Sequence, residues 1–105
     1  MVKIEWSKIS NYDILQIYSY IYQYSVYYAV NTINGIAKRT DNLEIFPFMG
    51  RKVPEYNLEK LRELIYKSYR IIYEVQLNKI IIHRIWHSAR NLPKQLISWN
   101  LIQKI

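Results

Sequence analysis

The sequence predicts an α+β fold, in which an N-terminal strand and an antiparallel helix hairpin precede a three-stranded antiparallel meander and a short C-terminal helix. Three observations support this prediction: alternating apolar residues at 2–6, apolar residues at helical spacing between 14 and 43, and three short β-rich runs after residue 60. With 105 residues, 50% of them hydrophobic, the chain can bury one core. We therefore expect residues 1–105 to form a single domain.

The first elements follow from apolar periodicity. Val2, Ile4 and Trp6 alternate with polar residues, which indicates a half-buried strand. Ser10 with Asp13 resembles a capping box and predicts a helix start. The apolar face of this helix is Ile14, Ile17, Tyr18, Ile21 and Tyr22.

A second helix is predicted from Ala29 to Leu43, and Pro47 ends the pattern. Asn34-Gly35 inside it would normally signal a turn. The apolar period continues on both sides, however, and one glycine costs a helix only about 1 kcal/mol. We therefore expect the helix to pass through Gly35 and the two helices to turn their apolar faces toward a sheet.

The second half of the chain predicts a loop followed by a meander. Gly50 and Pro54 punctuate a loop over 46–60. The strands expected after it are Leu61–Tyr66, Tyr69–Gln76 and Lys79–Trp86, with two-residue turns between them. Pro93 suits the start of a terminal helix, whose apolar residues are Leu96, Ile97, Leu101, Ile102 and Ile105. With helices on one face of the sheet, the other face is expected to be open.

A candidate site follows from the strand register. If Leu77-Asn78 is a two-residue turn, Arg70 lies beside Ile85 and diagonal to His83 on the wetter face. His87 and Arg90 follow where the last strand ends. Arginine binds phosphate oxygens and histidine exchanges protons near neutral pH.

These four residues therefore predict a phosphate-binding cluster with a titratable imidazole. The alternative is a basic sheet edge that carries two ordinary surface or capping histidines. An arginine at the centre of a strand must in either case find a partner.

Charge and composition restrict the function classes. The net charge is +7, and residues 51–105 hold 11 basic and 4 acidic groups, against 4 and 4 in residues 1–50. This excess predicts a cationic face for a polyanion or an acidic partner; a merely solubilising surface is the alternative. The absence of cysteine excludes disulfides and thiolate chemistry, and the histidines and aspartates form no ligand set, so we expect no metal and no cofactor. Without a signal-type run or a membrane span, a cytoplasmic protein is expected.

Eleven tyrosines could stack on nucleic-acid bases, but packing explains most of them. Expected in the core are Tyr18, Tyr22, Tyr28, Tyr69 and Tyr73. Tyr20, Tyr24 and Tyr27 fit the core less well, and they could form an exposed patch for a partner or for a second copy of the chain.

Several strings resemble the RelE/ParE superfamily of plasmid-stabilisation toxins, closer to its ParE branch. The resemblance covers nearly the whole chain and is strongest over 47–90. The strings are Pro47-x-x-Gly50-Arg51 with Val53-Pro54-Glu55, then Leu61-Arg62-Glu63-Leu64, Tyr69-Arg70-Ile71-Ile72-Tyr73-Glu74-Val75, and Ile82-His83-Arg84-Ile85-Trp86-His87-Ser88-Ala89-Arg90.

This resemblance implies the toxin of a type II toxin-antitoxin system, with a cognate antitoxin that neutralises it. The ParE branch implies a poison of DNA gyrase, docking through the basic second half; the residues expected to bind partners are Arg51, Lys52, Arg62, Arg70 and Arg90. The RelE branch implies a ribosome-dependent mRNA endoribonuclease, in which Arg70, His83, His87 and Arg90 would be catalytic.

The nuclease machinery is incomplete in this sequence. Such enzymes commonly use a late tyrosine or histidine as general acid, and no tyrosine follows Tyr73, so His87 or His83 would have to serve. Of a lysine pair found in some ribonucleases, only Lys60 is present, with Arg62 nearby. A nucleic-acid-binding module without toxicity is a third possibility.

Overall fold

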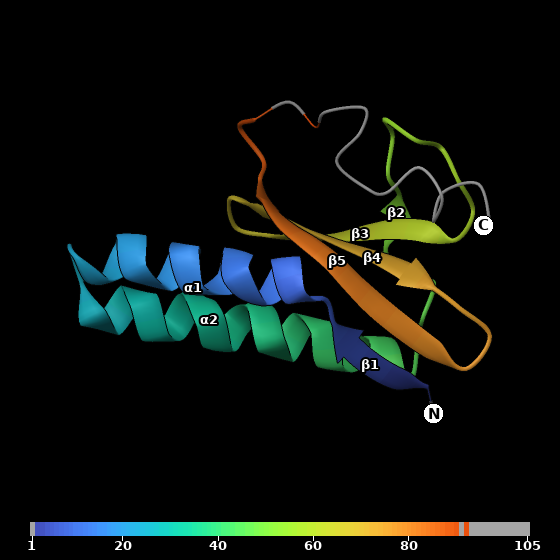
Figure 1. The fold of residues 1–105 in the computed structure, drawn as a ribbon, viewed down its shortest axis with the longest axis horizontal. Coiled ribbons are helices and arrows are strands. Elements are labelled where there is room, and N and C mark those ends of the chain that lie inside the picture. The colour runs from blue at the N-terminus through green and yellow to red at the C-terminus, as the bar shows by residue number, and fades with distance from the viewer. Residues whose placement is uncertain (1, 91, 93–105) are drawn as a thin grey trace.

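The computed structural model describes residues 2–90 and residue 92, and its elements form one sheet with a helix hairpin (Figure 1). The strand order is β1-β5-β4-β3-β2. Strand β1 (Lys3–Trp6) runs parallel to β5 (Lys79–His87), whereas β5, β4 (Tyr69–Val75), β3 (Leu61–Tyr66) and β2 (Arg51–Lys52) pair antiparallel. The predicted fold class is confirmed, with the two-residue strand β2 inside the expected loop. The predicted C-terminal helix lies outside the described residues.

Helix α1 (Lys8–Tyr22) begins three residues before the predicted start. Its N-cap is Ser7, whose hydroxyl accepts a hydrogen bond from the Ser10 amide at 3.0 Å. The Ser7 amide also donates to the Ile82 carbonyl, so this residue both ends the β1–β5 pairing and starts the helix. The prediction of Ser10 as the cap was wrong. The pairing of β1 with β5 ends at Ser7, and the Ser7 side chain is then placed to accept the hydrogen bond that caps the helix.

Helix α2 (Val26–Asp41) passes through Asn34-Gly35 without a break, as predicted, and leads into the short 3-10 helix η1 (Asn42–Glu44). Glycine is present here for a packing reason. A Cβ added to Gly35 would overlap the hydroxyl end of the Tyr66 ring, which comes from β3. The close approach of ring and helix backbone thus accounts for the glycine.

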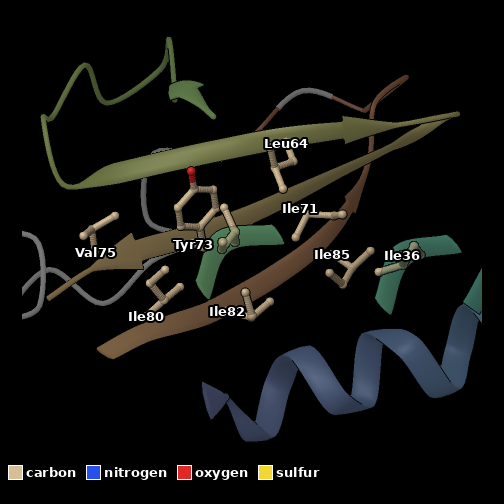
Figure 2. Packing of buried hydrophobic residues seen from close by; sticks show 9 residues of the cluster. Ile36, Leu64, Ile71, Tyr73, Val75, Ile80, Ile82 and Ile85 are labelled. Carbon is tan, nitrogen blue, oxygen red and sulfur yellow. The ribbon is translucent and has the colours of Figure 1, made fainter. Parts of the chain in front are cut away.

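The main core lies between the helices and one face of the sheet (Figure 2). Leu43 joins the cluster from η1. Its other buried residues come from α2 and the three long strands: Ile36, Leu64, Ile71, Tyr73, Val75, Ile80, Ile82 and Ile85. Burial of so many large apolar side chains makes this layer the main source of stability, at roughly 1.5–3 kcal/mol for each of them.

The opposite face of the sheet is not open, so that prediction was wrong. A second cluster forms there around Val53, Leu61, Ile72 and Leu92, with Tyr56, Leu58 and Trp86 packed against it. The segment between β2 and β3 therefore crosses this face. It does so because Ile72 and Leu61 present apolar surface that water would otherwise contact.

A β-bulge between Ile72 and Tyr73 changes the predicted register in part. Near the turn, Tyr73 pairs with Ile82 as predicted, but beyond the bulge Arg70 lies opposite Trp86 and not Ile85. The extra residue on β5 turns Ile85 into the helix-side core and Trp86 toward the second cluster. The bulge therefore decides which β5 side chains flank Arg70.

The far end of the helix hairpin extends past the sheet (Figure 1). Tyr73 is buried and Tyr69 packs against the core, as predicted. Tyr22 and Tyr28, also predicted to be core, are 51% and 62% exposed, because the helices reach beyond the strands that could cover them. Among the described helices, none has the length and apolar character needed to cross a membrane.

Candidate functional site

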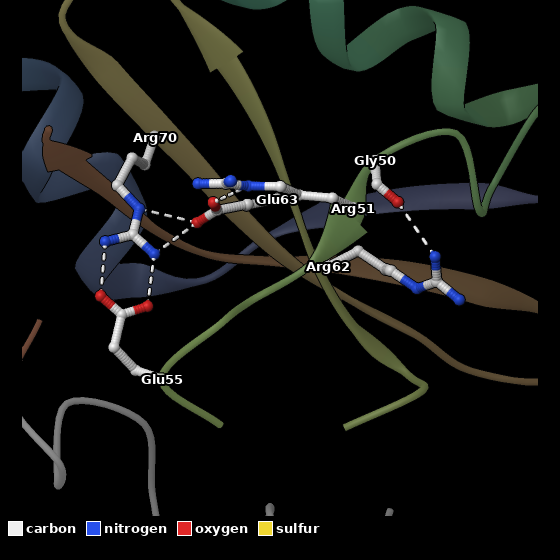
Figure 3. A network of polar contacts seen from close by, with 6 residues as sticks. All are labelled: Gly50, Arg51, Glu55, Arg62, Glu63 and Arg70. Carbon is white, nitrogen blue, oxygen red and sulfur yellow. Dashed lines mark hydrogen bonds and ion pairs between the residues drawn. The ribbon is translucent and has the colours of Figure 1, made fainter. Parts of the chain in front are cut away.

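Arg70 lies at the centre of a polar network on the second face of the sheet (Figure 3). Its Nε donates to Glu63 Oε1 at 2.7 Å, and its Nη1 and Nη2 donate to the two carboxylate oxygens of Glu55 at 2.9 and 2.7 Å. The Arg70 side chain is only 8% exposed. All three guanidinium nitrogens are thus occupied by carboxylates of the same chain.

The network has a definite charge order. Glu63, whose side chain is fully buried, also accepts a hydrogen bond from Arg51 Nε at 2.7 Å. The bidentate contact with Glu55 is the largest influence that raises the pKa of Arg70, and the same hydrogen bonds lower the pKa of Glu55. Both groups are therefore charged at neutral pH, and the network is an alternating row of cations and anions.

Arg62, on the helix-facing side of β3, contacts the loop over residues 46–60. Its Nη1 donates to the Gly50 carbonyl at 3.1 Å, its Nε and Nη2 contact Glu59, and its guanidinium lies over the Phe48 ring. Lys52 forms an exposed ion pair with Glu59 at 3.2 Å. Arg62 and Arg70, both predicted to bind a partner, are thus engaged in binding the chain's own loop.

His83 and Arg70 contact different carboxylates and do not form one cluster. Its Nε2 lies 2.8 Å from Glu74 Oε1, and Gln76 donates to the other oxygen of the same carboxylate. Burial opposes ionisation of Glu74, but the hydrogen bonds from His83 and Gln76 outweigh it, and the pKa of Glu74 is lowered. His83 therefore has a structural partner within the sheet, and its side chain is largely covered.

His87 and Arg90 lie together in a groove of about 640 Å³ between α1 and the end of β5. The His87 ring packs edge-on against Tyr69, and its Nδ1 accepts a hydrogen bond from the Ala89 amide at 3.1 Å. This contact leaves Nε2 as the ring nitrogen that carries hydrogen in the neutral tautomer. Both His87 and Arg90 are exposed, so the groove offers a cation and an imidazole to a ligand.

An ion pair that the sequence analysis missed forms one wall of this groove. Asp13 accepts hydrogen bonds from Arg84 Nε and Nη2 at 2.8 and 3.0 Å, and from the Ile85 amide at 3.0 Å. It thereby ties α1 to β5 where the β1 pairing has ended. Tyr69 lines the groove as well, and burial raises the pKa of its hydroxyl, which remains neutral near pH 7.

The predicted phosphate-binding cluster is thus divided among three places. Arg70 belongs to the buried network, His83 to its own pair with Glu74, and His87 with Arg90 to the groove. Arg51 and Lys52 lie on the edge strand β2 with exposed side chains. Glu55, Glu63 and Asp13 were the missed residues, and the only sequence signal for them was the requirement that a strand-centre arginine be paired.

The described residues contain no group of three histidine, aspartate or glutamate side chains placed to hold a metal ion. The groove brings the side chains of His87 and Arg90 together at its surface. These can bind an anion and donate or accept a proton.

Comparison with known proteins places this geometry in a family. A family model described as the ParE toxin of type II toxin-antitoxin system, parDE, matches residues 4–92. No curated protein matches the chain. A solved structure titled "Chromosomal ParDE TA system from P. aeruginosa" is similar, with a TM-score of 0.69 and 20% identity over 83% of this chain and 96% of that chain. At that identity the likeness is one of fold. Because the family model spans most of the sequence, the chain belongs to the ParE toxin family of type II toxin-antitoxin systems.

Proposed function

We propose that this ParE-family toxin inhibits DNA gyrase by binding it, and that a cognate antitoxin neutralises the toxin in the cytoplasm. Family membership supports the toxin role and the existence of an antitoxin. Two arguments support gyrase as the target. One is the resemblance to the ParE branch, and the other is that Arg70, which a nuclease would need, is bound by carboxylates of the same chain.

The observation that carries the proposal is the occupied guanidinium of Arg70. A ribonuclease needs a cationic side chain that can reach the scissile phosphate. Arg70 is the best sequence match to such a residue, yet it is buried and bonded to Glu55 and Glu63 through all its nitrogens. A phosphate would have to displace a bidentate carboxylate, which favours a binding toxin over an enzyme.

The cations that remain accessible suit a docking role. The Arg51 side chain is 62% exposed at the sheet edge, Lys52 lies beside it, and Arg90 is exposed at the groove. The second half of the chain has 11 basic and 4 acidic groups. Such a surface complements a protein–DNA complex or the acidic segment of an antitoxin, and it accelerates association with either.

The groove favours one alternative, a ribosome-dependent endoribonuclease acting on mRNA. His87 could serve as general acid through Nε2, and Arg90 could bind the phosphate, without any contribution from Arg70. This alternative makes His87 indispensable, whereas the gyrase proposal does not require its imidazole.

Two assays on the purified full-length chain separate the alternatives. We expect loss of gyrase supercoiling or accumulation of cleaved DNA, while mRNA in a translation extract stays intact. Arg51→Gln with Lys52→Gln should weaken the gyrase effect, while the control Lys3→Gln, an exposed lysine on β1, should not. Codon-dependent mRNA cuts that His87→Ala abolishes would instead establish the nuclease and overturn the gyrase proposal.

The antitoxin is tested in cells. Expression of the chain alone should arrest growth, and coexpression of the adjoining reading frame should relieve the arrest and yield a complex that copurifies. Normal growth in cells that contain the folded chain would contradict the toxin role.

A further inference from the structure

The far end of the helix hairpin carries exposed aromatic residues from both helices, which we name the tyrosine cap. Tyr24, the most exposed of the tyrosines, is 75% accessible. Each member exposes more than half of its surface, and the members are Tyr20, Tyr22, Tyr24, Val26, Tyr27 and Tyr28. The far end of the hairpin extends past the sheet (Figure 1), and one cap member, Tyr20, also lines the groove between α1 and β5. The other members of the cap line neither that groove nor the loop network, and they take no part in the His83–Glu74 pair.

The rings of the cap are ordered among themselves. The ring of Tyr20 on α1 and that of Tyr24, which follows the helix end at Tyr22, have centroids 5.6 Å apart, and Tyr27 and Tyr28 meet edge to face at the same separation. Tyrosine loses little side-chain entropy on binding, because it has few rotatable bonds. Ordered, exposed rings of this kind are typical of the centre of protein interfaces.

The cap is also uncharged. Between Asp13 and Lys38 the sequence contains no acidic or basic residue. At 1.5 Å per residue, Asp13 lies roughly 13 Å along α1 from Tyr22, and Lys38 roughly 17 Å along α2 from Tyr27, both beyond the ~8 Å screening length at physiological salt. Apart from Tyr20, whose groove also contains Arg84 and Arg90, the cap offers no complementary charge to nucleic acid or an acidic peptide.

From these observations we propose that the chain forms a homodimer through cap-to-cap contact. A second copy supplies the required surface, because an isologous contact places the same neutral aromatic patch on both sides. It also places the basic halves of the two copies at opposite ends, which minimises repulsion between two molecules of charge +7. The inference is independent of the gyrase target.

The exposed area of the cap limits the size of the contact. With about 200 Å² for each fully exposed tyrosine side chain, the cap presents roughly 600 Å² on each copy. Stable interfaces bury about 800 Å² on each partner. The contact is therefore smaller than that of a typical stable complex, and we expect a reversible monomer–dimer equilibrium.

Sedimentation of the full-length chain over a range of concentrations tests the proposal. We expect a monomer–dimer equilibrium that Tyr24→Lys with Tyr27→Lys weakens at least tenfold, because two like charges then meet across the contact. Phe46→Lys is the matched control: Phe46 is as exposed as the cap, but it follows α2 at the end opposite the cap. Circular dichroism checks that each variant is folded.

Two results of this experiment would overturn the proposal: a wild-type chain that stays monomeric at high concentration, and a dimer unaffected by the cap substitutions. Added salt should preserve the dimer, because it screens repulsion, and a dimer that dissociates in salt points to charged contacts elsewhere. Cap variants that lose antitoxin binding while the wild type is monomeric would assign the cap to the antitoxin.

A second measurement does not depend on the lysine variants. Because the chain has no cysteine, Tyr24→Cys introduces a single thiol. A bifunctional maleimide should link two Tyr24→Cys chains efficiently and two Phe46→Cys chains poorly. Equal linking of the two variants would contradict a contact centred on the cap.

Discussion

Arg70 on β4 and Glu55 in the segment after β2 are joined by two parallel hydrogen bonds, with N–O distances of 2.9 and 2.7 Å. This pair holds the segment across the second face of the sheet, above Ile72 and Leu61. A residue that resembles a nuclease's phosphate ligand is thus used to build the fold. Substitutions at Arg70 must accordingly be judged by stability before they are judged by activity.

Arg70→Ala should lower the free energy of unfolding by about 3 kcal/mol, because it leaves the buried Glu63 carboxylate with Arg51 as its one charged partner among the described residues. Urea denaturation measures the loss. Arg51→Ala, which removes a mostly exposed partner of the same carboxylate, should cost less than half as much. If Arg70→Ala kept its stability and lost toxicity, Arg70 would have to act on the target directly.

Asp13→Ala should destabilise the protein by about 2 kcal/mol, because it removes three hydrogen bonds and leaves the Arg84 guanidinium without its carboxylate. Thermal unfolding measures this change. Asp41→Ala, at an exposed position near the end of α2, is the matched control and should change little. Equal effects at the two positions would mean that Asp13 does not fasten α1 to β5.

Stability should fall in acid partly through Glu55. Its pKa lies below the usual 4.5 because Arg70 donates hydrogen bonds to it, so its contribution is complete above about pH 4.5 and is lost as the pH falls through the lowered value. Wild type should therefore be more stable than Glu55→Gln at neutral pH, and the gap should close in acid. Glu44→Gln is the control, and a gap of constant size across the pH range would refute the role of the ion pair.

Gly50→Ala should cost roughly 1–3 kcal/mol, the range for overpacking a filled site. A Cβ there would lie 2.5 Å from the Glu63 carbonyl oxygen and 2.7 Å from the Tyr73 hydroxyl, which itself accepts a hydrogen bond from the Gly50 amide. Gly35→Ala is the comparison, since only the mobile end of Tyr66 must move and alanine favours the helix. Denaturation midpoints should rank Gly50→Ala as the less stable variant.

The sequence alone was sufficient for the elements whose signals are local. Helical spacing on both sides of Gly35 correctly predicted an uninterrupted α2, and the turn at Leu77-Asn78 correctly predicted the pairing of Tyr73 with Ile82. Short-range periodicity reports directly on which side of an element is buried, so these predictions needed no information about distant residues.

Only the tertiary structure decided the surroundings of the candidate site. The strand segments at 71–73 and 80–82 are apolar without alternation, so the sequence does not reveal a bulge that changes the face of Ile85 and Trp86. Glu55, which binds Arg70, and Asp13, which binds Arg84, lie 15 and 71 residues away from these arginines along the chain. Such pairings depend on how the loop and α1 pack on the finished sheet. The sequence therefore showed the basic, toxin-like character of the chain. Long-range packing determined that Glu55 and Glu63 bind Arg70 and that His87 and Arg90 remain accessible.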